Sequence, residues 1–332
     1  MSTTNTGTVL PPLTNYGCPA IAEIEYLLCF VGSVWKTPHL EAQANHLLTG
    51  LTTTLNDRHA NGVFSQYLGG KTAGARLIGG RTTVRNMVFD MEWSSRLDRA
   101  DLQRVAKQVL DTWSEWHAVS WVWSDEAARK PHPAIVLVLP PGTIMDDAKV
   151  ADGPTSSMEG RASIHGTFLW PDAPPEPISQ SQAVYFCAAV WSDGCNGASM
   201  PSHLTHKAWE PWQNTCAALY NELAEFRTNQ NVDALSWPNW QSRNLVGWVA
   251  FYDDTWQEIG DLTLEWANPL PEKTYGLLGS HHAPMTLLWS NTTKSPHTPP
   301  PPPGHQPPPL PGPYFPEDYT PHMSPYFAFK RP

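Results

Sequence analysis

The chain has 332 residues, enough for one large domain or two ordinary ones, and 41% of them are apolar while 16% are charged. Acidic residues outnumber basic ones by 31 to 21, which gives a formal net charge of −10, and no run of Lys and Arg offsets this charge locally. The sequence therefore argues against direct binding to nucleic acid. Its apolar runs are far shorter than the ~20 residues of a membrane span, so no membrane span is expected either.

The N-terminal residues and the cysteines bear on location. Residues 1–16 have neither a basic start nor an apolar segment, so we expect no secretory signal, and their polar composition predicts an irregular arm. The five cysteines contain no CxxC pair, which favours reduced thiols over a disulfide or zinc framework. Together these features predict an intracellular, cytoplasmic location or a virion surface.

The first part of the body alternates between helical and strand patterns. Apolar residues recur every three or four positions over 20–35, which predicts a largely buried helix. A second amphipathic helix should begin near Pro38. Residues 82–93 alternate as a strand, and Ser95 or Asp98 can cap the helix that follows them.

Strand patterns recur along the rest of the body, at residues 119–123, 134–139, 183–191, 245–252, 261–266 and 284–289. A further helix should open at Pro211, because proline is favoured in the first turn. We therefore predict an α+β body over residues 17–290, with a mixed or antiparallel sheet packed against several helices. Two similar halves, 17–150 and 160–290, remain an alternative because the letters VWSD end a predicted strand in each.

The C-terminal stretch, residues 291–332, differs from the body in composition. It holds 15 of the chain's 34 prolines, which fix φ and remove amide donors, so it should form an extended polyproline II arm. Such an arm could be a solvated linker, a PxxP-type ligand or a tether along a neighbouring subunit, and its aromatic residues favour the tether. The residues that we expect to contact the partner are Pro301, Pro308, Leu310, Tyr314, Phe315, Tyr319, Tyr326, Phe327 and Phe329.

Candidate nucleophiles and metal ligands are scattered along the chain. Cys195 could act as a nucleophile if an imidazole lay within hydrogen-bond reach, but a free thiol in a turn is the simpler interpretation. The histidines that could take part are His117, His165, His203, His206, His281 and His282. His203, His206, His281 and His282 could also bind a metal, but a metal site needs three or more converging ligands, and we predict none here.

Acidic and glycine-rich stretches offer no firmer site. Asp146–Asp147, Asp253–Asp254 and Glu258 could be imagined as paired carboxylates, but each falls in a predicted loop, and we interpret them as solvated turns. Gly69–Thr72 has the last letters of a P-loop without its first glycine or the preceding strand. The sequence thus predicts no catalytic residue, no cofactor and no metal.

Sixteen tryptophans, few charges and a long arm favour contact with other proteins. The sequence therefore predicts a non-enzymatic structural or assembly protein. Its body and C-terminal arm would dock on other protein subunits of a larger complex, as in the outer surface of a virus capsid. Two alternatives stay open: an intracellular hydrolase that uses Cys195 and a histidine, and a carbohydrate-binding module built on exposed tryptophans.

Overall fold

The computed structural model describes much of the body and little of the two ends. The described residues are 10–58, 60–77, 88–89, 96–112, 132–146, 156–159, 161–169, 183–193, 196, 209–231, 246–252, 255–260, 275–278, 283–292 and 294–296. The expected partner-contacting residues of the arm all lie outside these ranges. So do the predicted strands at 119–123 and 261–266 and most of the predicted strand at 82–93.

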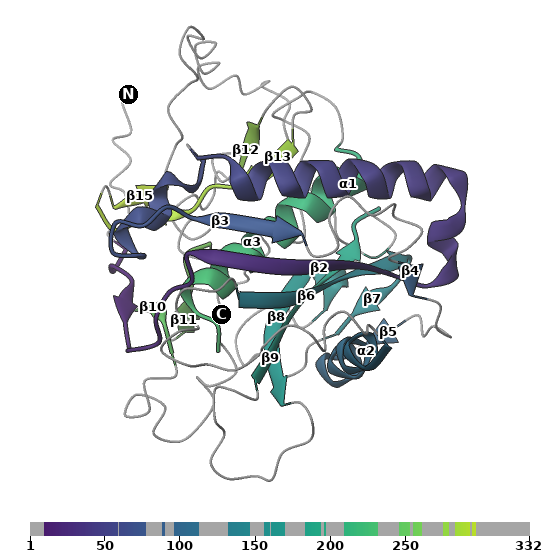
Figure 1. The fold of residues 1–332 in the computed structure, drawn as a ribbon, viewed down its shortest axis with the longest axis horizontal. Helices are drawn as coiled ribbons and strands as arrows, with labels where there is room; N and C mark the ends of the chain where they lie inside the picture. The colour runs from purple at the N-terminus through teal and green to yellow at the C-terminus, as the bar shows by residue number, and fades with distance from the viewer. Residues whose placement is uncertain are drawn as a thin grey trace, which may run out of the picture.

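A mixed sheet forms the centre of the body (Figure 1). Its strands lie in the order β3 (Gly74–Leu77), β2 (Glu23–Val31), β6 (His132–Pro141), β9 (Ala183–Trp191) and β8 (Ser163–Leu169), and β4 (Val88–Phe89) also pairs with β2. The pairs along β2, β6 and β9 are parallel, whereas β8 is antiparallel to β9. The predicted α+β class with a mixed sheet is confirmed.

The segment at 20–35 is not the predicted helix. It forms β2 and the short 3-10 helix η1 (Ser33–Lys36). Every side chain from Ile24 to Val31 is buried, so both faces of this strand are covered. A short apolar run that is buried on all sides has no periodicity to separate a strand from a helix. Pairing with β3 on one side and β6 on the other makes it a central strand.

Helices cover both faces of the sheet. α1 (Pro38–Asn56) and α3 (Pro211–Thr228) pack against each other, and α3 also contacts β8 and β9. α2 (Arg99–Thr112) lies on the side of the sheet opposite α1 (Figure 1). The crossovers β2–α1–β3 and β4–α2–β6 step in opposite directions along the sheet. Because such crossovers are right-handed, they place α1 and α2 on opposite faces.

The starts of the helices agree with the sequence patterns. Pro38 and Pro211 each occupy the first turn of a helix, as predicted. Asp98 caps α2, because its Oδ1 accepts a hydrogen bond from the amide of Asp101 at 2.8 Å. The strand predicted at 183–191 coincides with β9. Local sequence patterns were therefore sufficient to predict where these helices begin and where β9 lies.

Short elements complete the described body. The short strands pair as β1 (Thr14–Asn15) with β10 (Trp248–Tyr252), β10 with β11 (Thr255–Gln257), β5 (Arg96–Leu97) with β7 (Ile144–Met145), β12 (Tyr275–Leu278) with β13 (Ala283–Thr286), and β14 (Trp289–Ser290) with β15 (Ser295–Pro296). The 3-10 helices η2 (Ala60–Gln66) and η6 (Ser157–Glu159) lie between longer elements. The strand predicted at 245–252 is confirmed in β10, and the one predicted at 284–289 is divided between β13 and β14.

Every described tryptophan is buried or half-buried. Trp35, Trp191 and Trp289 are among the largest fully buried side chains. The rings of Trp35 and Trp191 meet edge to face with centroids 4.9 Å apart, and Trp35 Nε1 donates a hydrogen bond to the carbonyl of Val31 at 2.9 Å. Trp35, Trp191 and Trp289 are therefore core residues.

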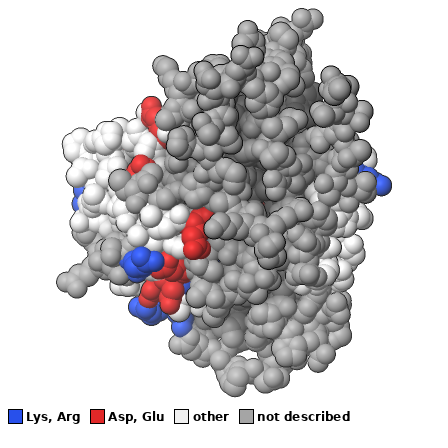
Figure 2. Space-filling view, turned by 180° about the vertical axis from the view of Figure 1, so that it is seen from behind, with Lys and Arg blue, Asp and Glu red and all other residues white. Residues whose placement is uncertain are grey.

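The described surface carries charges of both signs. Figure 2 shows basic and acidic side chains close together on the described part of one face. One such pair joins Arg96 to Asp146, with Nε 2.8 Å from Oδ2, and another joins Arg104 to Asp101 within α2. Among the described helices, none has the length and apolar character that crossing a membrane requires.

Candidate metal centre

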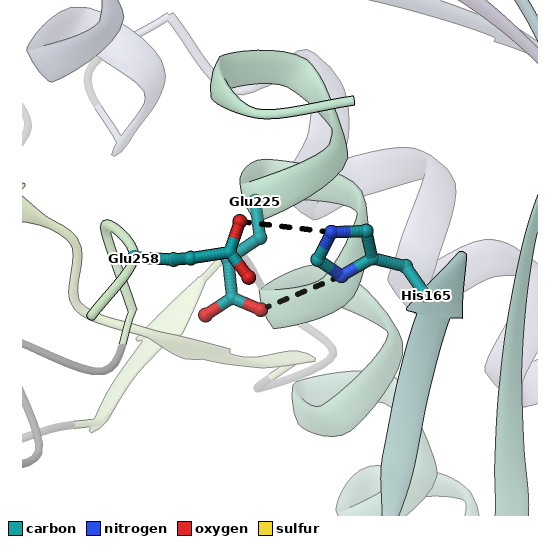
Figure 3. Close-up of side chains that lie close together, drawn as sticks. All are labelled: His165, Glu225 and Glu258. Carbon is teal, nitrogen blue, oxygen red and sulfur yellow. Dashed lines mark ion pairs between the residues drawn. The ribbon is translucent and has the colours of Figure 1, made fainter. Parts of the chain in front are cut away.

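Four ionisable side chains converge between the edge strand β8 and helix α3. His165 projects from β8, Glu225 comes from α3, and Glu258 directly follows β11 (Figure 3). The fourth, Glu222, lies one turn before Glu225 on α3. All four are buried, with exposed fractions of 4% for His165 and Glu225, 6% for Glu258 and 7% for Glu222. Ionisable groups are rarely buried unless a partner compensates them, so this cluster is the strongest functional candidate among the described residues.

The imidazole of His165 lies between three carboxylates. Its Nδ1 is 2.9 Å from Oε2 of Glu222, which is a hydrogen bond, and 3.8 Å from Oε2 of Glu225. Its Nε2 faces Glu258 at 3.6 Å from Oε1, too far for a hydrogen bond. Nε2 is fully buried and has no hydrogen-bond partner among the described residues. The imidazole is thus bound at one nitrogen and unsatisfied at the other.

A neighbouring side chain orients each of the three carboxylates. Ser163 Oγ donates to Glu222 at 2.7 Å, Asn221 Nδ2 donates to Glu225 at 2.8 Å, and Asn229 Nδ2 donates to Glu258 at 2.9 Å. Asn229 is itself fixed, because its Oδ1 accepts a hydrogen bond from the amide of Gly247 at 2.9 Å. Such a layer of supporting hydrogen bonds is typical of groups that hold a metal ion or a proton in a fixed geometry.

The backbone of β8 is held from the side of α2. Arg99 Nη1 donates to the carbonyl of His165, and Gln103 Nε2 donates to the carbonyl of Thr167, each at 3.1 Å. The two donors are four residues apart and therefore lie on the same face of the helix. They occupy carbonyls of β8 that would otherwise remain unpaired at the edge of the sheet. Strand β8 is therefore fixed by β9, α2 and α3 together.

Two glycines allow the surrounding segments to close tightly. A Cβ on Gly260 would lie 2.0 Å from Asn221 Oδ1 and 2.6 Å from Glu225 Oε1. A Cβ on Gly247 would lie 2.0 Å from the main-chain oxygen of Thr228. Any larger residue at either position would collide with groups that form or support the cluster. The absence of a side chain at these positions brings Glu258 and α3 together.

The cluster strongly affects the protonation of its members. Burial alone disfavours a charged imidazole, but the negative charge of Glu258 and the hydrogen bond to Glu222 outweigh it and raise the pKa of His165 to about 9. Cys187 lies opposite His165 on β9. Burial and the charges of Glu222 and Glu225 raise the pKa of this thiol well above its ordinary value, so it stays protonated.

The geometry suits a divalent metal ion. Once the proton on Nε2 is displaced, the hydrogen bond from Nδ1 to Glu222 fixes the tautomer in which the lone pair of Nε2 can bind a metal. Two ligand atoms that each lie ~2.1 Å from a tetrahedral metal are about 3.4 Å apart, close to the 3.6 Å between Nε2 and Glu258 Oε1. One ligand atom each from His165, Glu225 and Glu258 can be chosen so that all three lie within 4.8 Å of one another. The 3.8 Å contact of Glu225 is with Nδ1, so the Glu225 carboxylate must shift toward Nε2 to complete this set of ligands.

The sequence did not point to this cluster. His165 was considered only as a partner for Cys195, which lies outside the described residues together with His117, His203, His206, His281 and His282. The interpretation of Glu258 as a solvated turn residue is wrong, because the side chain is buried against α3 and β8. Asp146, by contrast, forms a partly exposed pair with Arg96. Asp147, Asp253 and Asp254 lie outside the described residues.

The sequence contained one indication that Glu222 is buried. The helical stripe of α3 includes Leu219, Leu223 and Phe226, and Glu222 falls three residues after Leu219 on the same face. A carboxylate inside an apolar stripe predicts either a partner or a function. No comparable signal marks Glu258, because its burial depends on segments that are distant in the sequence.

Comparison with known proteins adds no assignment: no protein-family model, no curated protein and no solved structure matches this chain.

Proposed function

We propose that the protein binds one divalent metal ion between His165, Glu225 and Glu258. The observation that carries this proposal is the buried Nε2 of His165, which has no hydrogen-bond partner and faces the carboxylate of Glu258 at 3.6 Å. Glu222 would not bind the metal but would hold the imidazole through Nδ1, as carboxylates do in many zinc sites. Asn221 and Asn229 would orient the two ligating glutamates.

The chemistry of the ligands narrows the choice of metal. One imidazole and two carboxylates suit Zn²⁺, Mn²⁺ or Fe²⁺ better than Ca²⁺, which prefers six to eight oxygen ligands. Three protein ligands leave a coordination position for water in a tetrahedral site. Metal binding would displace the proton from Nε2, so affinity should rise with pH in the neutral range.

The burial of the ligands favours a structural role for the metal. No member of the cluster is more than 7% exposed, which leaves little access for a substrate. The ion would join β8, α3 and the segment after β11, which are far apart in the sequence. A metal that links such segments stabilises the folded state because the unfolded chain cannot gather the ligands.

A metal-stabilised body is compatible with the wider proposal of an assembly protein that docks on other subunits, in the cytoplasm or on a virion surface. The described cysteines support a reducing environment, since Cys18, Cys29, Cys187 and Cys216 are free thiols. The proposed docking role would be tested by deleting the arm and measuring incorporation into the native complex. Normal incorporation of the truncated chain would contradict it.

The metal proposal is tested by elemental analysis and calorimetric titration of the chelator-treated protein with Zn²⁺ and Mn²⁺. We expect one ion per wild-type chain, and we expect Glu258→Gln to lose it because the substitution removes a ligand charge and keeps the shape. Glu159→Gln is the matched control, since Glu159 is exposed on η6 away from the cluster. Retention of the ion by Glu258→Gln, or a wild-type chain that binds neither metal, would overturn the proposal. If the wild-type chain binds neither metal, the cluster holds only protons.

A further inference from the structure

Three aromatic side chains lie together on the sheet formed by β1, β10 and β11. Phe251 and Trp256 are directly opposite each other in the β10–β11 pair, and their ring centroids are 5.1 Å apart. Tyr16 follows β1 and meets Trp256 edge to face at 5.8 Å. We call these three residues the aromatic platform. Rings at these separations attract one another and form a continuous apolar surface.

Phe251 presents this surface to solvent. Its side chain is 53% exposed, which is more than any other large hydrophobic residue in the described part of the chain. Tyr16 and Trp256 are half-buried beside it. A single exposed apolar residue is ordinary on a protein surface. Here, however, the exposed ring packs against Trp256, which in turn contacts Tyr16, and a set of adjoining aromatic rings is typical of a recognition site.

The C-terminal arm leaves the body beside this platform. Its last described residues, Ser295 and Pro296, belong to β15 and pair with β14. The amide of Trp289 in β14 donates to the carbonyl of Ile259 at 2.9 Å, and Ile259 lies three residues after Trp256. We call Ser295 and Pro296 the root of the arm. Their pairing with β14, together with the hydrogen bond from Trp289 to Ile259, places this root next to the strand that carries Trp256.

A second contact joins the segment before the root to the chain that carries Tyr16. The side chain of Asn291 accepts a hydrogen bond from the amide of Leu13 at 2.9 Å and donates one to its carbonyl at 2.8 Å. Leu13 lies three residues before Tyr16. Three residues of extended chain span roughly 10 Å, so both contacts hold Trp289 and Asn291 near the platform, and Pro296 pairs with Trp289.

The segment that follows has the chemistry that aromatic surfaces bind. Residues 299–303 are five consecutive prolines, which favour the polyproline II conformation without internal hydrogen bonds. In that conformation, at about 3.1 Å per residue, the run would extend from roughly 10 Å to roughly 20 Å beyond Pro296. Grooves lined with aromatic residues recognise such helices because the proline rings pack on the aromatic faces.

We propose that the proline run 299–303 of the same chain packs on the aromatic platform. The short connection from Pro296 keeps the local concentration of the run high, in the millimolar range for short linkers, so even a weak contact would be populated. The platform would thus fix the first part of the arm against the body. The later aromatic residues of the arm would remain available for a partner.

The test uses the full-length chain with Phe251→p-benzoylphenylalanine, a photo-reactive side chain at the centre of the platform. After illumination and trypsin digestion, we expect a crosslink between the peptide carrying residue 251 and the arm peptide 295–330, within chains of monomer mass. Met158→p-benzoylphenylalanine is the matched control because Met158 is 47% exposed on η6. It should form no such crosslink.

Three results would overturn the proposal: a crosslink that joins two chains, a crosslink only to another protein, or no crosslink to the arm. A second measurement uses cleavage of the arm by a protease that cuts after proline. We expect Phe251→Ser to be cleaved within residues 297–313 about tenfold faster than the wild-type protein, because loss of the ring exposes the arm. Met158→Ser should be cleaved at the wild-type rate. Equal rates for all three proteins would contradict the contact.

Discussion

Gly260 offers a sharp test of the metal centre, because a single methyl group there should displace a ligand and leave the fold intact. In Gly260→Ala the new Cβ would lie 2.6 Å from Glu225 Oε1, whereas ordinary contacts begin near 3.4 Å. The carboxylate must therefore retreat by about 0.8 Å. Asn221, whose Oδ1 would be 2.0 Å from the same Cβ, must move as well and would no longer orient Glu225.

The expected energies follow from the groups that move. Both colliding atoms are at the ends of side chains, so rotation can relieve the overlap, and the metal-free protein should lose about 1–3 kcal/mol of unfolding free energy. Metal affinity should fall by about 10–100-fold, as it does when groups that support a ligand are removed. The substitution thus separates metal binding from folding.

The assay compares calorimetric titration with Zn²⁺ and urea unfolding in the presence of chelator, for Gly260→Ala and for the wild-type protein. We expect a weaker metal isotherm together with a single cooperative unfolding transition, whose midpoint is lowered by the loss of about 1–3 kcal/mol. Wild-type affinity in Gly260→Ala would refute the assignment of Glu225 as a ligand. Failure of the variant to fold in chelator would refute the argument that the overlap can be relieved by side-chain rotation.

Three further predictions follow from individual contacts. Gly247→Ala should destabilise the protein more than Gly260→Ala, since its Cβ would lie 2.0 Å from a main-chain oxygen that cannot rotate away, and urea unfolding in chelator will rank the two. In the metal-free protein, the pKa of His165 is raised from 6.5 to about 9, so its stabilising effect is complete below pH 6.5 and is lost as the pH rises through 9. That loss should be about 3 kcal/mol, measured by urea unfolding at pH 6.5 and 9, and it should be absent in His165→Gln. Thiol labelling of the native protein at pH 8 followed by peptide mapping should leave the buried, high-pKa cysteines unmodified, namely Cys18, Cys29, Cys187 and Cys216. Fast labelling at Cys195 in the same experiment would favour the hydrolase alternative, and slow labelling would count against it.

Several elements could be predicted from the sequence because their signals are local. Pro38 and Pro211 mark helix starts, since proline fixes the backbone angle that a first turn needs and its missing amide has no partner there in any case. Asp98 caps α2 through the amide three residues later. The apolar run in β9 is bounded by polar and proline-rich stretches, which limits its length to that of a strand. In each case the residues that decide the conformation lie within one or two turns of one another.

The metal centre and the identity of β2 depended on contacts between distant segments, and the sequence could not supply them. The run from Ile24 to Val31 is apolar on every side, so only its hydrogen bonds to β3 and β6 make it a strand. Glu258 is buried because β11 and its following turn lie against α3, an arrangement that Gly247 and Gly260 permit. His165 meets Glu222 only because β8 packs against α3. The sequence by itself determined which residues can form helices, strands and an extended arm, whereas tertiary packing decided which ionisable groups meet, since burial and distance are properties of the folded chain.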